Sequence, residues 1–277
     1  MSNHKGKVLF FDIDGTLVNF SGIMPDSTQE ALRQARRNGH YVVLCTGRSK
    51  CQIYDWLKTF GVDGMICAAG AYVEYGGQVI SHDVIGHSAL VKVIDFMEQE
   101  HIVYGLQCTG HNVSTTSGIE TMRKMFSERF HMDAEQVETL FGDTEYDDDP
   151  RGRTDVDKMI YYDSPLGIEA VRQALSPEFD VTLSSFEEPD ETSGEITQAG
   201  ITKAYGMQKL LRYLNMCRED TIAFGDGPND LDMLRFAHCG VAMGNAGEDV
   251  KTVADLVTEH IDRDGVYLAM KQLGLID

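Results

Sequence analysis

Two aspartates, Asp12 and Asp14, directly follow the apolar segment at residues 8–11 and stand just before Gly15. A wholly apolar strand is buried on both faces, so carboxylates at its end emerge where open α/β sheets bind ligands. Residues two apart on an extended chain face the same side, and we expect the two carboxylates to converge. Paired carboxylates repel each other, and proteins usually offset this repulsion by binding a hard divalent cation between them. Gly15 lets the backbone turn away without a side chain in a ligand's path.

A second segment suited to phosphate comprises Thr46, Gly47 and Arg48, which follow another apolar stretch. A hydroxyl group, a glycine and backbone amides at the start of a helix can cradle a phosphate. Simple helix capping explains the same residues equally well.

Two later segments supply a cation and more carboxylates. Lys203 stands in the first turn of a predicted helix, where a cation opposes the helix dipole unless an anion pairs with it. By itself such a lysine is usually a surface residue. Asp226, Asn229 and Asp230 follow a third apolar segment and predict a second acidic group at the end of a strand.

Strands and helices alternate at both ends of the chain. Apolar runs predict strands at residues 7–11, 41–45, 65–68, 221–224 and 240–243, and helical periodicity predicts helices at 27–38, 50–60, 202–214 and 231–237. Ser27 and Glu30 fit a capping box, and Gly39 and Gly61 stand where helices should end. Residues 71–74 and 78–80 predict a hairpin around two glycines. This alternation predicts an α/β fold with a doubly wound, parallel, Rossmann-like sheet.

Residues 83–197 have a different pattern and predict an inserted α/β domain. Helices are expected near residues 88–100, 120–130 and 166–175, and strands at 103–108, 158–162 and 181–185. Two acidic segments, 142–149 and 187–195, are interpreted as solvated loops, because neither has the spacing of an EF-hand. The predicted domains are therefore residues 1–82 with 198–277, and residues 83–197.

The composition excludes several classes of protein. The 44 Asp and Glu against 24 Lys and Arg give a net charge of -20, which argues against nucleic acid as a partner. No apolar run approaches the roughly 18 residues that a membrane span needs, so no membrane association is expected. Six scattered cysteines without a C-x-x-C pair indicate reduced thiols in a cytoplasmic protein, and zinc is not expected.

Taken in order, these segments resemble the haloacid dehalogenase superfamily, and within it the Cof-type branch (subfamily IIB) of sugar-phosphatase-like hydrolases. The resemblance rests on a D-x-D-G-T box at 12–16, Thr46, Lys203 and a G-D-x-x-N-D box at 225–230, with further similarities at 241–246, 254–255 and 264–266. In that branch an α/β cap is inserted between the second and third motifs, which is where residues 83–197 fall. Ala69 is a departure, since many relatives have asparagine there and Ala69 cannot make the hydrogen bonds of that amide.

The resemblance also implies roles for individual residues. Asp12 would attack phosphorus, and Asp14 would protonate the leaving group and then deprotonate water. Mg²⁺ would be held by the Asp12 carboxylate, the Asp14 backbone carbonyl and Asp226, with Asp230 securing the metal shell. Thr46 and Lys203 would bind the phosphoryl oxygens, and Asn229 would position the phosphoryl group together with Asp230. Gly15, Thr16, Gly47 and Arg48 would also belong to the substrate-binding residues.

We therefore expect a Mg²⁺-dependent phosphatase that hydrolyses small phosphorylated metabolites, above all sugar phosphates, as a monomer or weak homo-oligomer. Substrate choice is expected to depend on polar residues of the insertion: Gln107, His111, Asn112, Arg123 and Lys124. The alternatives are a phosphomutase and a catalytically silent protein that binds a phosphorylated ligand. A dinucleotide-binding enzyme is disfavoured, because no G-x-G-x-x-G follows the first strand.

Overall fold

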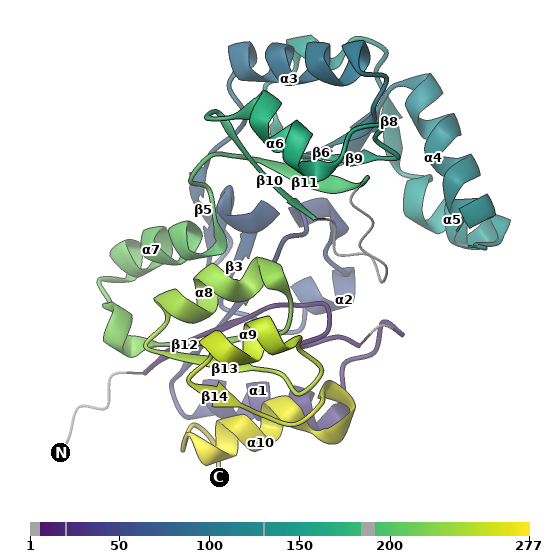
Figure 1. Cartoon of the computed structure of the whole chain (residues 1–277). Helices are drawn as coiled ribbons and strands as arrows, with labels where there is room; N and C mark the ends of the chain where they lie inside the picture. The colour runs from purple at the N-terminus through teal and green to yellow at the C-terminus, as the bar shows by residue number, and fades with distance from the viewer. Residues whose placement is uncertain (1–5, 20, 130, 184–191) are drawn as a thin grey trace. The chain divides into compact units, whose positions relative to one another are not determined.

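The chain forms two compact units, each built around its own sheet. A computed structural model describes residues 6–19, 21–129, 131–183 and 192–277 (Figure 1). The first unit comprises Met1–Arg48, Ile53–His82 and Thr202–Asp277, and the second comprises Ser49–Gln52 and Asp83–Ile201. The second unit extends beyond residue 197 because its last strand runs to Gln198.

The first unit contains an eight-stranded sheet in the order β14-β13-β12-β1-β2-β3-β4-β5. Six neighbouring strands run parallel, namely β14 (Leu256–Val257), β13 (Cys239–Ala242), β12 (Thr221–Gly225), β1 (Val8–Phe11), β2 (Tyr41–Cys45) and β3 (Gly64–Cys67). The predicted hairpin, β4 (Tyr72–Tyr75) and β5 (Gln78–His82), continues the sheet antiparallel to β3. β1 lies between β12 and β2, so the carboxyl ends of these strands meet at one edge.

Helices cover both faces of this sheet, which confirms the doubly wound α/β class (Figure 1). One face carries α1 (Asp26–Arg37), α2 (Asp55–Lys58) and α10 (Gly265–Gln272); the other carries α7 (Lys203–Leu214), α8 (Leu231–Phe236) and α9 (Glu248–Val253). Side chains of β1 alternate between the two cores: Phe11 packs with Leu32 of α1, and Phe10 with Leu210 of α7. Burial on both faces explains the unbroken apolar sequence of this strand.

Two of the helices predicted within residues 27–60 were wrong in detail. α1 begins at Asp26 without a side-chain cap, and the Ser27 hydroxyl instead donates to Asp264 Oδ1 at 2.6 Å. The helix predicted at 50–60 is divided into η1 (Lys50–Gln52) and α2, because Tyr54 between them has an extended backbone (ψ 131°). The other short 3₁₀ helices are η2 (Ala68–Gly70), η3 (Pro150–Gly152), η4 (Arg218–Asp220), η5 (Pro228–Asp230) and η6 (Ile261–Arg263).

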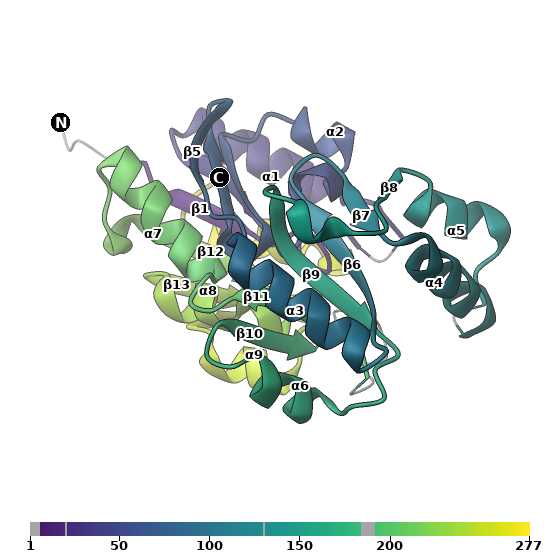
Figure 2. The same cartoon turned by 90° about the horizontal axis from the view of Figure 1, so that it is seen from above.

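The second unit contains a six-stranded sheet in the order β10-β11-β9-β6-β7-β8. Its strands are β6 (Val103–Cys108), β7 (Asn112–Ser114), β8 (Thr144–Tyr146), β9 (Val156–Tyr162), β10 (Phe179–Leu183) and β11 (Gly194–Gln198). All neighbours pair antiparallel except β7 and β8. Its helices α3 (His87–Gln99) and α6 (Ile168–Leu175) pack on one face (Figures 1 and 2), and α4 (Thr116–Arg129) and α5 (Ala134–Phe141) pack around Ile160 and Tyr162.

The interpretation of two acidic segments as loops holds for residues 142–143, 147–149 and 192–193 and was wrong for two short strands. Residues 144–146 form β8, since Thr144 pairs with Asn112 of β7. Glu195 belongs to β11, and its carboxylate accepts a 2.7 Å hydrogen bond from the buried Lys158 ammonium. Positions 130 and 184–191, to which some of the predicted elements extend, lie outside the described residues.

Candidate active site

Carboxylates from two distant segments meet at the carboxyl ends of β1 and β12. Phe11 and Phe224 are register partners, and the Asp12 amide continues the pairing by donating to the Phe224 carbonyl at 3.0 Å. Asp226 follows β12, and Asp230 ends η5. One oxygen of each of the three aspartates lies within 4.8 Å of the others. The structure thus brings the two predicted acidic groups together.

Lys203 joins this group from the first residue of α7. Its ammonium Nζ lies 2.7 Å from Asp12 Oδ1 and 2.5 Å from Asp230 Oδ1, and the lysine is only 2% exposed. A cation in the first turn of a helix opposes the helix dipole, and here its two anionic partners offset that unfavourable interaction. We refer to Asp12, Asp226, Asp230 and Lys203 as the acidic cluster.

Two glycines bring the start of α7 close enough for Lys203 to reach its partners. A Cβ atom on Gly206 of α7 would stand 2.5 Å from Ile66 Cγ2, and one on Gly70 would stand 2.0 Å from the Thr202 carbonyl oxygen. Gly70 also has a φ of +111°, which side-chain-bearing residues rarely adopt. Larger residues at either position would push α7 away from β3 and withdraw the ammonium.

Backbone and side-chain donors hold the carboxylates of Asp226 and Asp230. Asp230 Oδ2 accepts from the amides of Asp226 (2.9 Å) and Gly227 (3.0 Å). The Thr16 hydroxyl donates to Asp226 Oδ1 at 2.8 Å. Asn245 Nδ2 donates to Asp226 Oδ2 at 3.2 Å and to the Gly15 carbonyl at 2.8 Å.

Asn245 is a site residue to which sequence analysis gave no role. Its side chain ties the turn after β1 to the segment after β12, and its Oδ1 accepts from the Ile261 amide at 3.1 Å. The sequence feature that could have identified Asn245 is its position in segment 241–246, shortly after a buried strand.

The acidic cluster has more negative charge than its lysine balances. Burial is the largest cause that raises the pKa of Asp12 well above its ordinary value, followed by the Asp230 charge. The same two causes raise the pKa of Asp226 to about 7. One ammonium facing three carboxylates leaves a deficit that a divalent cation can fill, and carboxylate oxygens are ligands that Mg²⁺ accepts.

Asp14 does not join this compact group, contrary to the expectation for an extended chain. β1 ends at Phe11, and Ile13 turns into the apolar core. The half-exposed Asp14 carboxylate instead forms an ion pair with Arg48, with Nε to Oδ2 at 2.7 Å. The buried Thr46 hydroxyl accepts from the Arg48 amide at 3.1 Å.

The remaining predicted site residues lie in segments that follow strands of the first sheet. Gly15 takes a φ of +79°, and a Cβ atom there would stand 2.0 Å from Asp226 Oδ2. Gly47 is half-buried in the turn after β2, and Asn229 is exposed on η5. Ala69 adopts a left-handed φ of +54°, which alanine tolerates less well than asparagine does.

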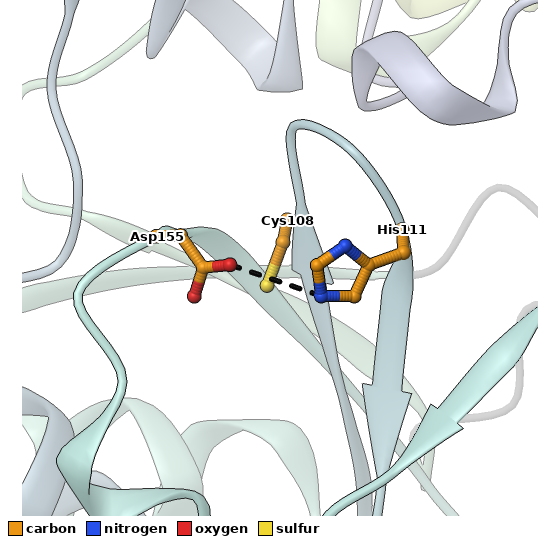
Figure 3. Close-up of side chains that lie close together, drawn as sticks. All are labelled: Cys108, His111 and Asp155. Carbon is orange, nitrogen blue, oxygen red and sulfur yellow. Dashed lines mark ion pairs between the residues drawn. The ribbon is translucent and has the colours of Figure 1, made fainter.

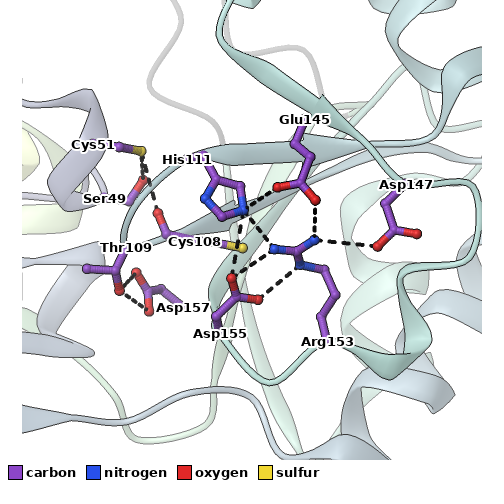
Figure 4. A network of polar contacts seen from close by, with 10 residues as sticks. All are labelled: Ser49, Cys51, Cys108, Thr109, His111, Glu145, Asp147, Arg153, Asp155 and Asp157. Carbon is purple, nitrogen blue, oxygen red and sulfur yellow. Dashed lines mark hydrogen bonds and ion pairs between the residues drawn. The ribbon is translucent and has the colours of Figure 1, made fainter.

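A second group of metal-type donors occurs in the second unit. Cys108 Sγ, His111 Nε2 and an Asp155 oxygen lie within 4.8 Å of one another (Figure 3). Arg153 Nη2 lies 2.7 Å from His111 Nε2 and 2.8 Å from Asp155 Oδ2, so a guanidinium already engages two of these three donors (Figure 4). Hydrogen bonding from Arg153 lowers the pKa of Asp155. We refer to these four residues as the Arg153 cluster.

The Arg153 cluster is a structural ion-pair network. Arg153 Nη1 also lies 3.0 Å from Glu145 Oε1 and 3.4 Å from Asp147 Oδ2, so the guanidinium links β8 to the segment before β9. Among the proposed substrate-selecting residues, His111 belongs to this network and Arg123 pairs with Glu138. Gln107 is buried on β6.

The model of the haloacid dehalogenase-like hydrolase family matches residues 9–270 of the chain. This chain belongs to that family. It is 30% identical to the putative phosphatase YkrA of Bacillus subtilis, over 98% of both chains. It is 28% identical to the 5-amino-6-(5-phospho-D-ribitylamino)uracil phosphatase YitU of Bacillus subtilis, over 97% of both chains.

Solved structures agree with this assignment. The structure of the haloacid dehalogenase subclass IIB sugar phosphatase BT4131 is 31% identical, with a TM-score of 0.77, over 98% of this chain and all of that one. This haloacid dehalogenase-like hydrolase is therefore an enzyme of the phosphatase type. Within the described ranges, none of its helices combines the length and apolarity that crossing a bilayer requires.

Proposed function

We propose that this hydrolase is a Mg²⁺-dependent phosphatase that acts on small phosphorylated metabolites, chiefly sugar phosphates, through an aspartyl-phosphate intermediate. The observation that carries the proposal is the acidic cluster, in which Asp12 lies 2.7 Å from a buried ammonium at the end of a central strand. The preference for sugar phosphates is supported by the likeness to a subclass IIB sugar phosphatase.

In the first half of the proposed reaction, Asp12 attacks the phosphorus atom of the substrate. A bond forms between an Asp12 carboxylate oxygen and phosphorus while the bond from phosphorus to the leaving oxygen breaks. Asp14 gives its proton to that oxygen, so the product leaves as a neutral alcohol. Lys203 and Thr46 hold the phosphoryl oxygens, on which negative charge accumulates.

In the second half, water hydrolyses the aspartyl phosphate. Asp14, now a carboxylate, takes a proton from the water as its oxygen bonds to phosphorus, and Asp12 is released as a carboxylate. Asp230 keeps Lys203 in place through their 2.5 Å contact. Asn229 is proposed to orient the phosphoryl group.

The donor set fits a hard divalent cation. The Asp12 and Asp226 carboxylates and the Asp14 backbone carbonyl would hold it, and Thr16 and Asn245 orient Asp226. Asp230 engages both of its oxygens with Lys203 and two amides, so we assign it to orienting this shell. Bound Mg²⁺ supplies positive charge that lets the anionic substrate approach three carboxylates.

A panel of phosphorylated metabolites, assayed for phosphate release with Mg²⁺ or with EDTA, tests this proposal. We expect release that requires Mg²⁺ and is fastest with sugar phosphates, and its loss in Asp12→Asn. Asp155→Asn is the matched control, since it removes a carboxylate from the Arg153 cluster. An isomeric sugar phosphate in place of free phosphate would indicate a mutase, and no turnover of any compound would contradict the proposal.

A further inference from the structure

Arg48 holds Asp14 by both of its carboxylate oxygens. Arg48 Nε donates to Asp14 Oδ2 at 2.7 Å, and Nη2 donates to Oδ1 at 2.8 Å. Two parallel hydrogen bonds between a planar guanidinium and a planar carboxylate fix the rotation of the carboxylate as well as its distance. A single ammonium could not do the same.

Arg48 is itself held on an aromatic surface. Its guanidinium carbon lies 4.8 Å from the centre of the Tyr54 ring, and Nη2 donates to the Tyr54 hydroxyl at 3.3 Å. The Tyr54 ring is in turn stacked with the ring of Trp56, with centres 5.7 Å apart. At the backbone, the Arg48 amide is fixed to the Thr46 hydroxyl at 3.1 Å.

The contact with Arg48 matters because the position of Asp14 in the fold restrains its side chain only weakly. Asp14 lies beyond the end of β1, in a turn whose backbone is closed by a bridge to Val18, and its side chain is 43% exposed. An exposed carboxyl group on such a turn samples several rotamers, whereas a group that gives a proton must stay within hydrogen-bonding reach of the leaving oxygen. Each Asp14 oxygen accepts a hydrogen bond from Arg48 and keeps a second lone pair, on which the transferred proton would lie. Exposed ion pairs add little stability, so this bidentate contact serves orientation more than folding.

We propose that Arg48 is a positioning residue that fixes the orientation of the Asp14 carboxylate, with Tyr54 as its platform. The inference rests on the proposed function, in which Asp14 transfers the proton to the leaving group. It differs from the role in phosphate binding that the sequence resemblance implied for Arg48, because two nitrogens of the guanidinium are already committed to Asp14.

The proposal predicts a dependence on the leaving group. An alkyl phosphate must release a strongly basic alkoxide, so its hydrolysis depends on a well-placed proton. A nitrophenyl phosphate releases a weakly basic phenolate and depends much less on one. Loss of Arg48 should therefore slow alkyl phosphates selectively, while loss of a phosphate-binding group should slow both classes alike.

The experiment compares kcat/KM of wild type, Arg48→Gln and Arg48→Lys for alkyl and aryl phosphates of graded leaving-group basicity, with Mg²⁺ present. For Arg48→Gln we expect alkyl phosphates to slow by about 10-fold to 100-fold and nitrophenyl phosphate by less than about threefold. The loss should lie in kcat, and inhibition by inorganic phosphate should keep its strength. Arg48→Lys should recover only part of the loss, and Tyr54→Leu should shift the same ratio by a smaller factor.

Two controls separate orientation from general damage. Arg33 makes a similar contact, with its guanidinium carbon 4.9 Å from the Phe60 ring centre, so Arg33→Gln should leave both substrate classes unchanged. In an Asp14→Asn background, adding Arg48→Gln should cause no further loss on alkyl phosphates, since no proton donor remains to be oriented.

Three results would overturn the role of Arg48 in an active enzyme. Parallel losses on both classes with weaker phosphate inhibition would assign Arg48 to phosphate binding. An unchanged ratio would leave it without a part in proton transfer, and faster alkyl hydrolysis would mean that it restrains Asp14. A wild-type protein that releases no phosphate from any substrate would instead overturn the proposed function, and this inference with it.

Discussion

The acidic cluster and the Arg153 cluster each bring three metal-type donors within 4.8 Å, yet their charges differ. In the acidic cluster, burial and mutual repulsion raise the pKa of Asp226 to about 7. In the Arg153 cluster, the guanidinium lowers the pKa of Asp155. Donor geometry alone therefore does not identify a metal site. Both clusters contain a protein cation, and they differ in burial. Desolvation is the largest cause of the raised pKa of Asp226, whereas the carboxylates around Arg153 remain partly exposed to water.

The largest difference between the clusters should appear in catalysis. Asp12→Asn removes the proposed nucleophile and should lower kcat on the order of 10³-fold or more, with the fold retained. Asp155→Asn should leave kcat close to that of wild type. Phosphate release and circular dichroism measure both effects. More than a few per cent of wild-type turnover in Asp12→Asn would exclude Asp12 as the nucleophile.

The next difference concerns removal of the cation in each cluster. Lys203→Met leaves the buried carboxylates of Asp12 and Asp230 and the partly buried one of Asp226 facing one another, and it should lower the free energy of unfolding by about 3 kcal/mol or more. Arg153→Met should cost about 1 kcal/mol, since its carboxylate partners are partly exposed to water. Urea denaturation at neutral pH with EDTA provides the comparison. Equal losses would show that the two clusters have the same charge balance.

Added Mg²⁺ should stabilise one cluster and not the other. A ligand at about 100 times its Kd adds roughly 2.7 kcal/mol to the free energy of unfolding, and we expect a shift of this kind in the wild-type protein. Asp226→Asn should abolish the shift, while His111→Ala should keep it. Thermal denaturation with and without Mg²⁺ measures the shift. Its persistence in Asp226→Asn together with its loss in His111→Ala would reverse the assignment.

The smallest expected effect is a dependence of stability on pH in the metal-free protein. Because the pKa of Asp226 is about 7 when folded and about 3.9 when unfolded, the folded state binds the extra proton between these values. Stability should therefore fall as pH rises from about 4 to about 7. The lowered pKa of Asp155 acts in the opposite sense and below this range.

Denaturant midpoints measured in EDTA between pH 5 and 8 test this sign. Asp226→Asn should flatten the decline, whereas Asp155→Asn should leave it in place. A wild-type midpoint that rises over this interval would show that the acidic cluster carries no uncompensated charge.

Sequence patterns predicted the carboxylate groups because each follows a strand that is apolar along its whole length. Asp12 and Asp226 converge because β1 and β12 are parallel neighbours. Lys203 is a cation placed unfavourably for its helix dipole, but this position alone is typical of a surface residue, and only the family resemblance gave it a place in the site. The carboxylate patterns are local. In a parallel sheet the carboxyl ends of the strands lie along one edge, so residues that follow different strands come together there.

Other contacts in the molecule depend on tertiary register, which no local pattern records. Arg48 and Asp14 meet because the turns after β1 and β2 lie side by side. Cys108, His111 and Asp155 meet through the hairpin that joins β6 to β7 and the start of the neighbouring strand β9, and their spacing in sequence resembles no metal motif. β8 was hidden because three residues are too few for a periodic signal.

The most direct test of the proposed chemistry is to trap the phosphorylated enzyme. A sugar phosphate mixed with the Mg²⁺-loaded protein is quenched with acid during the first turnover, and borohydride then reduces any aspartyl phosphate to homoserine. We predict homoserine at position 12, identified by peptide mass spectrometry, and an unmodified Asp12 when substrate is omitted. Rapid phosphate release with homoserine at another aspartate, or at none, would contradict the account.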